Sequence, residues 1–104
     1  MMSVLLEFAM FPTDKGESVS QYVGEVIQMI KESGVRYKLT AMGTIIETET
    51  IDEALAIVSK SYKVLEPYSN RVYSSVKLDI RKGKSNRLEE KIKSIESKIG
   101  KVDH

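Results

Sequence analysis

The sequence predicts an α+β fold, in which helices cover one face of an antiparallel sheet. Two stretches, residues 19–33 and 51–65, carry apolar residues at steps of three and four positions, which is the spacing of one face of an amphipathic helix. Residues 71–81 alternate between apolar and polar side chains, which indicates a strand with one buried face. Together with β-branched stretches between them, these segments follow the order strand, helix, strand, strand, helix, strand.

The first strand, residues 4–11, is apolar on both faces except at Glu7. Pro12 ends it, because proline cannot donate a hydrogen bond to a continuing sheet. A two-layer domain of this size covers only one face of such a strand with its own helices. We therefore expect a second subunit to cover the other face.

Both main helices have recognisable ends in the sequence. Ser18 with Gln21, and Thr50 with Glu53, have the spacing of capping boxes, in which two side chains satisfy the first free N–H groups of a helix. Gly34 follows the first helix at a position where a left-handed residue commonly ends one. The apolar stripes consist of Val19, Tyr22, Val23, Val26, Ile27 and Ile30 in the first helix, and of Ile51, Ala54, Leu55, Val58, Tyr62 and Leu65 in the second.

Residues 35–49 are predicted to form two short strands joined at Met42, Gly43 and Thr44. Gly43 is the one residue of this stretch that adopts a positive φ without steric cost, so we expect the chain to turn or bulge there. Such a corner exposes backbone amides and the Thr44 hydroxyl. We predict that this corner contacts a ligand.

The last predicted strand is followed by a loop and a third helix. Asn86 is placed to cap this helix, whose apolar stripe is narrow. A helix with so thin a stripe must lie on the rim of the fold or against another subunit. The stripe consists of Leu88, Ile92, Ile95 and Ile99.

The order of the elements is that of a split βαβ unit, a ferredoxin-like βαββαβ sandwich with an added C-terminal helix. Residues 1–104 are predicted to form this single domain, with two helices on one face of a four-stranded antiparallel sheet and the other face bare. The bare face is too apolar to be in contact with water. It presents Leu5, Glu7, Ala9 and Phe11 beside Tyr73, Ser75, Lys77 and Asp79.

Composition argues against several classes of function. The chain has no cysteine and one histidine, His104, so neither a thiolate metal site nor a paired-histidine site can form. A formal net charge of +1 gives no field that attracts nucleic acid, and the strands lack the adjacent aromatic residues of RNA-binding sheets. No apolar run approaches the ~20 residues of a membrane span. We expect a cytoplasmic protein without a metal, a cofactor, a nucleic-acid partner or a membrane partner.

The sequence also lacks the motifs of catalysis, and we expect no enzymatic activity. Glu47 and Glu49 lie two positions apart and so share one face of a strand. This pair suits either a hard metal ion or a solvated sheet edge, and the solvated edge is the simpler interpretation. Glu47 alone is close to the predicted corner and can accept a hydrogen bond from a ligand amino group.

Nearly the whole chain resembles the family of small thiamine-binding proteins with a ferredoxin-like fold. The matching stretches are SVSQYVGEVIQMIKESGVRYKLTAMGTIIE, IDEALAIVSKSYKVL, NRVYSSVKLDIRKGK and LEEKIKSIESKIG. The most specific of them are residues 33–47 and the strand end VKLDIRKG. The loop at residues 12–18 departs from the family's usual proline-leucine-glycine version, which leaves the rim of the pocket and the choice of ligand open.

The resemblance implies a cytosolic homo-oligomer, a tetramer built from dimers through their sheets. It implies binding of thiamine, or of its hydroxymethylpyrimidine part, without transformation, in a pocket at the sheet face and subunit junction. The residues that carry over are Met42, Gly43, Thr44 and Glu47, with Ser20, Tyr37 and Asp79 as further members.

The residue types are compatible with such a ligand. An aminopyrimidine offers an exocyclic amine and ring-nitrogen acceptors, which Glu47 and Thr44 can satisfy, and a cationic thiazolium suits Asp79 or stacking on Tyr37. Glu47 should have a protein partner when the site is empty, because a buried unpaired carboxylate is costly. Two alternatives stay open: a structural or regulatory oligomeric module without a ligand, and an enzyme that uses Glu47 and Asp79.

Overall fold

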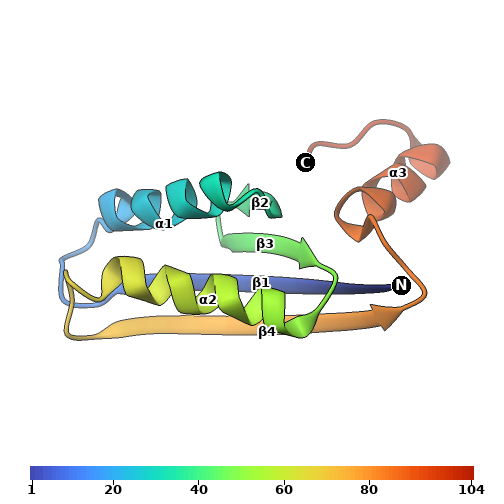
Figure 1. The fold of residues 1–104 in the computed structure, drawn as a ribbon. Coiled ribbons are helices and arrows are strands. Elements are labelled where there is room, and N and C mark those ends of the chain that lie inside the picture. The colour runs from blue at the N-terminus through green and yellow to red at the C-terminus, as the bar shows by residue number, and fades with distance from the viewer.

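The computed structural model describes residues 1–104 and confirms the ferredoxin-like α+β order with an added C-terminal helix (Figure 1). Two helices lie side by side in front of the sheet, and the third projects away from its far end. The elements are β1 (Met2–Pro12), α1 (Ser20–Ser33), β2 (Arg36–Thr40), β3 (Gly43–Thr48), α2 (Ile51–Leu65), β4 (Val72–Lys82) and α3 (Arg87–Ile99).

The sheet has the strand order β2-β3-β1-β4, and all neighbours are antiparallel. Strand β1 lies inside the sheet, where Phe8 is opposite Thr44 of β3 and Val76 of β4. Because side chains alternate along a strand, this register decides which residues face the helices. The even-numbered residues of β1 do so, and they are buried with residues of α1, α2 and β3 in one core: Val4, Leu6, Phe8, Met10, Val26, Ile30, Ile46, Ala54, Ile57 and Leu65.

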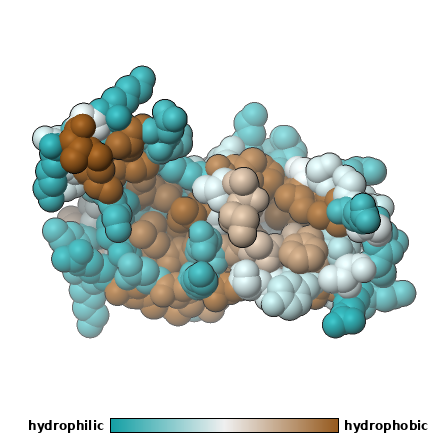
Figure 2. Space-filling model, turned by 180° about the vertical axis from the view of Figure 1, so that it is seen from behind, coloured by the Kyte–Doolittle hydropathy of each residue, from teal (hydrophilic) through white to brown (hydrophobic).

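The bare face has the composition that the sequence predicts. Leu5 of β1 is opposite Asp79 of β4, and Phe11 is opposite Tyr73, with their rings 5.8 Å apart. Figure 2 looks onto this side and shows apolar surface between polar groups, with α3 standing out at one end. The first turn of α3 covers that end, and Leu88 is its one buried residue.

The helix ends confirm two of the predicted signals and correct one. The Thr50 hydroxyl accepts the Glu53 N–H at 3.2 Å and donates to the Glu53 carboxylate at 2.8 Å, and Gly34 ends α1 with a φ of 79°. The predicted box at Ser18 does not form, because α1 begins at Ser20 and Val19 is its N-cap residue. Gln21 is therefore the second residue of the helix and not the third, which a capping box requires.

The corner between β2 and β3 forms earlier in the chain than predicted, with Gly43 and Thr44 already in β3, and it has a different cause. The turn consists of Ala41 and Met42, between the paired residues Thr40 and Gly43, and Gly43 does not have a positive φ. The Thr40 hydroxyl holds the turn, accepting the Met42 N–H at 3.2 Å and donating to the Gly43 carbonyl at 2.8 Å. A Cβ atom at position 43 would lie 3.0 Å from the Phe8 carbonyl oxygen. Glycine thus permits the close approach of β3 to β1.

Strand β4 departs from the prediction of a half-buried strand. Its even-numbered residues do face the side of the helices, but Val76, Leu78 and Ile80 remain 41%, 41% and 47% exposed. Alternation shows which way a side chain points and not whether anything covers it. Two helices cover the inner strands and leave this outer strand open on both faces.

No helix of the structure is both long enough and apolar enough to cross a lipid bilayer.

We expect Gly43→Ala to destabilise the protein by about 1–3 kcal/mol, because the added methyl group presses on the Phe8 carbonyl and overpacks the β1–β3 contact. Urea unfolding followed by circular dichroism measures this change. Gly24→Ala is the control, because Gly24 lies in α1 and a Cβ atom added there would meet nothing within 4 Å. That change should instead stabilise the protein by about 0.5–1 kcal/mol. Equal effects at both positions would contradict the close-approach explanation.

Candidate functional site

The structure separates the predicted site residues into two groups at opposite ends of β3. Met42, Gly43 and Thr44 lie together at the β2–β3 turn, where a cavity opens. Glu47 lies at the other end of β3 on the bare face, and Arg87 connects it with Asp79.

The remaining two predicted residues belong to neither group. Ser20 is the exposed first residue of α1. Tyr37 is half-buried on the helix side of β2 and packs against the core. One monomer therefore does not bring all seven predicted residues into a single site.

The cavity lies between α1 and the ends of β1, β2 and β3, on the helix side of the sheet. Its volume is about 270 Å³, and 11 of its 14 lining residues are hydrophobic. The residues that α1 and β1 contribute were not among those predicted from the sequence, although the apolar stripe of α1 contained several of them. Those that point into the space from the helix face or from the turn are Phe8, Met10, Val19, Val23, Val26, Ile27, Leu39, Met42 and Thr44.

Thr44 supplies the polar group of this cavity. It faces the helix side opposite Phe8 and is only 5% exposed. Its hydroxyl makes no hydrogen bond to the rest of the chain. Every side-chain oxygen or nitrogen that is fully inaccessible does have a partner, so the Thr44 hydroxyl is not fully inaccessible. The hydroxyl is therefore accessible from outside the chain, and Thr44 is one of the residues that line the cavity.

The mouth of the cavity is formed by the turn itself. Met42 is 86% exposed, and a flexible thioether side chain at a rim adapts to ligands of different shape. Thr40 also lines the cavity, but its hydroxyl is already bonded within the turn. An apolar space with one free hydroxyl suits a small flat ring that carries one hydrogen-bonding edge.

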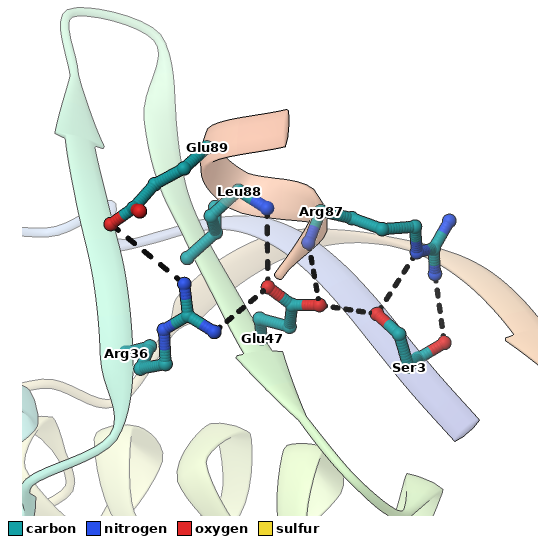
Figure 3. Close-up of polar contacts among 6 residues, drawn as sticks. All are labelled: Ser3, Arg36, Glu47, Arg87, Leu88 and Glu89. Atoms are coloured by element: carbon teal, nitrogen blue, oxygen red, sulfur yellow. Dashed lines mark hydrogen bonds and ion pairs between the residues drawn. The ribbon is translucent and has the colours of Figure 1, made fainter. Parts of the chain in front are cut away.

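The second group is centred on Glu47, which is buried although it is charged (Figure 3). One carboxylate oxygen accepts the Ser3 hydroxyl and the Arg87 N–H, the latter at 3.0 Å. The other accepts the Leu88 N–H at 3.1 Å and lies 3.6 Å from the Arg36 guanidinium. Both oxygens are thus bonded to the protein, which confirms the expectation that Glu47 has partners without a ligand.

These contacts make Glu47 the cap of α3. The first N–H groups of a helix have no partner within it and carry partial positive charge. Asn86 stands at the N-cap position, but it is left-handed with a φ of 57° and its side chain makes no capping bond. The prediction that Asn86 caps the helix is therefore wrong, because a carboxylate 40 residues earlier in the chain occupies the amides.

Arg87 joins this network to Asp79. Its Nε donates to the Ser3 hydroxyl at 2.9 Å, and its Nη2 donates to the carbonyls of Ser3 and Asp79. Its Nη1 lies 3.2 Å from the Asp79 carboxylate, which is itself 70% exposed. The sequence did not predict a functional role for Ser3, Arg36 or Arg87. Ser3 could have been found, because it lies on the same face of the sheet as Glu47.

The surroundings of Glu47 change its protonation. Burial on its own raises the pKa of the Glu47 carboxyl, but hydrogen bonds from Ser3, Arg87 and Leu88 and the charge of Arg36 lower it by more. The net pKa lies below the ordinary value of 4.5, so Glu47 is ionised at neutral pH. No group of three His, Cys, Asp or Glu residues is arranged to hold a metal ion.

The comparison with known proteins agrees with this fold. A family model described as "Thiamine-binding protein" matches residues 6–96. The chain belongs to this family. A UPF0045 protein of Methanocaldococcus jannaschii is 37% identical over 95 residues, which cover 91% of this chain and 94% of the relative. A UPF0045 protein of Methanothermobacter thermautotrophicus is 36% identical over 83 residues, which cover 79% and 84%.

Solved structures extend the likeness to three dimensions. The crystal structure of the Methanocaldococcus protein has a TM-score of 0.78 and 38% identity, covering 91% of this chain and 97% of that one. A Thermotoga maritima protein, assigned provisionally to thiamine biosynthesis or salvage, has a TM-score of 0.76 and covers 89% and 98%. At 20% identity, the Thermotoga protein shares the fold.

Glu47→Gln should loosen the start of α3 and remove the pH dependence of stability that the Glu47 carboxylate contributes. Because the pKa of Glu47 is lowered on folding, its contribution to stability is complete above the unfolded value near 4.5 and is lost as the pH falls through the folded value. We expect the protection factors of the Arg87 and Leu88 amides, which correct for the pH dependence of intrinsic exchange, to fall at acid pH in the natural protein. Glu47→Gln should show low protection factors at neutral pH as well.

Glu49→Gln is the matched control, because Glu49 is exposed and lies just past the end of β3, contrary to the prediction that it shares a strand face with Glu47. Hydrogen exchange by NMR between pH 3 and pH 7 makes the comparison. Slow exchange of both amides in Glu47→Gln at neutral pH would contradict the capping role.

Proposed function

We propose that this protein binds thiamine or a related aminopyrimidine, such as hydroxymethylpyrimidine, without transforming it. We further propose that it acts as a cytoplasmic homo-oligomer, with the cavity at the β2–β3 corner as its binding site. The observation that carries the proposal is Thr44, which lines an apolar cavity, is almost buried, and has a hydroxyl without a hydrogen-bond partner in the chain.

The size and lining of the cavity support a single aromatic ring as the occupant. Its volume of about 270 Å³ lies just below the range of ligand sites, which span roughly 300–1,000 Å³, so the occupant must be small. Apolar residues of α1 and β1 suit the two faces of a pyrimidine, and Thr44 offers a donor and an acceptor to a ring nitrogen or an exocyclic amine. Membership of the thiamine-binding family gives the proposal its ligand class.

The polar residues at the other end of β3, around Glu47, have contacts that support a structural role. Glu47 keeps its charge and has both oxygens bonded to protein groups, and Asp79 is paired with Arg87. A ligand amine could reach Glu47 only if the first turn of α3 moved away. We therefore propose that Met42, Gly43 and Thr44 contact the ligand, while Glu47 and Asp79 hold α3.

Thr44→Val tests the ligand contact, because it removes the hydroxyl and keeps the shape of the side chain. We expect calorimetric titration with hydroxymethylpyrimidine and with thiamine to show about 3- to 10-fold weaker binding, the effect of one lost hydrogen bond. Thr48→Val is the control, since Thr48 is on the same strand and face but outside the cavity. Absence of heat from either compound at millimolar concentration with folded natural protein would refute the proposal.

A second candidate is a structural or regulatory oligomeric module that binds no small molecule. The exposed apolar residues Val76, Leu78 and Ile80 favour it, because they provide an assembly surface that does not include the cavity.

Val23→Trp distinguishes the two candidates, because the larger side chain fills the cavity from α1. If the protein is a ligand-binding oligomer, this variant should lose binding by at least tenfold and keep its sedimentation coefficient. If it is a ligand-free module, natural protein and variant should assemble alike and neither should bind. Ligand binding that survives in a folded Val23→Trp variant would place the site elsewhere.

A further inference from the structure

A hollow separate from the corner cavity lies between α3 and the sheet, and we call it the α3 groove. Its volume is about 910 Å³, and only 3 of its 14 lining residues are hydrophobic. One wall is the end of β4 with the loop that follows it, and the other is one face of α3. The α3 groove shares no lining residue with the corner cavity, so what it binds does not depend on the proposed function.

The α3 groove concentrates the positive charge of the chain. It is lined by five basic and two acidic side chains, whereas the whole chain has a formal net charge of only +1. Of the acidic pair, Asp79 is neutralised by Arg87 at 3.2 Å, and Glu90 is exposed. The four remaining basic residues take part in no ion pair of the chain: Arg81, Lys84, Lys91 and Lys98. A hollow lined by one sign of charge attracts a counter-ion.

These four basic residues come from both walls of the groove. Lys91 and Lys98 are seven positions apart on α3, which places them on one face of the helix and about 10 Å apart along its axis. Arg81 lies on the bare face near the end of β4, and Lys84 lies in the loop after it. An anion in the α3 groove is therefore approached by positive charge from two sides.

The loop between β4 and α3 also offers hydrogen-bond donors that the fold does not use. The backbone N–H groups of Lys84, Ser85 and Asn86 make no hydrogen bond within the chain. Gly83 and Asn86 have a left-handed backbone, and turns of this kind can direct successive N–H groups into a concavity that binds anions. The first amides of α3 are not part of this site, because Glu47 accepts them.

Apolar side chains lie among these polar groups. Leu5 is on the bare face of β1, opposite Asp79, and Ile95 is one turn after Lys91 on α3 and is 37% exposed. Figure 2 looks onto this side of the molecule and shows apolar surface next to α3 with polar groups around it. An inorganic ion gains nothing from such surface, whereas an apolar ring attached to an anionic group would bury it.

We propose that the α3 groove binds a small organic phosphate ester, with its phosphate group at the loop of residues 84–86 and its apolar part against Leu5 and Ile95. A phosphate group carries a charge of about −1.5 to −2 at pH 7 and three strong acceptor oxygens. Its charge matches several unpaired basic side chains at once, and its oxygens match the consecutive free amides of the loop. A carboxylate has less charge and two oxygens, so a phosphate is the better complement.

Titration with phenyl phosphate tests the site, because this compound joins a phosphate group to a single apolar ring. We expect the backbone amide signals of Lys84, Ser85 and Asn86 to shift in two-dimensional NMR spectra of the full chain. Benzoate has the ring without the phosphate, and inorganic phosphate lacks the ring, so both should bind more weakly. Unshifted signals at all three amides with millimolar phenyl phosphate would overturn the proposal, and so would equally tight binding of benzoate or inorganic phosphate.

Lys91→Gln removes one charge from the wall of the groove. We expect calorimetric titration to show about 2- to 5-fold weaker binding of phenyl phosphate, the effect of one exposed charge pair. Lys93→Gln is the matched control, because Lys93 is on the same helix and carries the same charge but does not line the groove. Equal weakening in the two variants would show a general attraction of anions to the chain, which contradicts a site in the α3 groove.

Thr44→Val separates the α3 groove from the corner cavity. Because Thr44 lines only the corner cavity, phenyl phosphate should bind to this variant as tightly as to the natural protein. Weaker binding of phenyl phosphate to Thr44→Val would place the phosphate ester in the corner cavity and overturn the proposal. Failure of the natural protein to bind a pyrimidine would refute the proposed function and leave the expected phenyl phosphate binding unchanged.

Discussion

The pairing of β1 with a neighbour on both of its edges is the constraint on which the rest of the structure depends. Its register with β3 sets Phe8 opposite Thr44, and its register with β4 sets Leu5 opposite Asp79. A slip by one residue would exchange every core side chain for one from the bare face. The corner cavity and the Glu47 network both inherit their positions from this strand, although they lie on opposite faces of the sheet.

A second constraint follows from the number of layers. Two helices are enough to bury the helix side of the inner strands, but β4 and most of α3 remain outside the core. The apolar residues on these outer elements therefore do little for the stability of a single chain. Exposed apolar residues of this kind are typical of surfaces that contact a partner.

Much of the fold follows from local patterns, because alternation and helical spacing report directly on which side of an element is apolar. The stripes of α1 and α2, the Thr50 cap and the Gly34 stop are signals of that kind, and the structure agrees with them. The sequence prediction places the N-cap of α1 at Ser18, one residue too early, because Ser18 and Gln21 happen to have the spacing of a capping box. The sequence suggests that Gly43 is needed for a positive φ. The structure shows instead that glycine is needed because the Phe8 carbonyl of β1 leaves no room for a Cβ atom.

The candidate site shows the same limit more strongly. Met42, Gly43 and Thr44 are neighbours in the chain, so it could be predicted that they lie together at the corner. The rest of the cavity comes from α1 and β1, and the Glu47 network joins Ser3, Arg36 and Arg87 across three separate elements. Such contacts depend on packing angles and on the path of a loop, and no periodicity in the sequence records either.

Two residues with a left-handed backbone, Gly83 and Asn86, lie between β4 and the first turn of α3. The chain changes direction there, and the first amides of the helix bond to the Glu47 carboxylate. Asparagine accepts that conformation more readily than β-branched residues do. The direction of the C-terminal helix thus depends on a short loop: a relative with β-branched residues at both positions would carry its last helix in another direction and would need other donors for its glutamate.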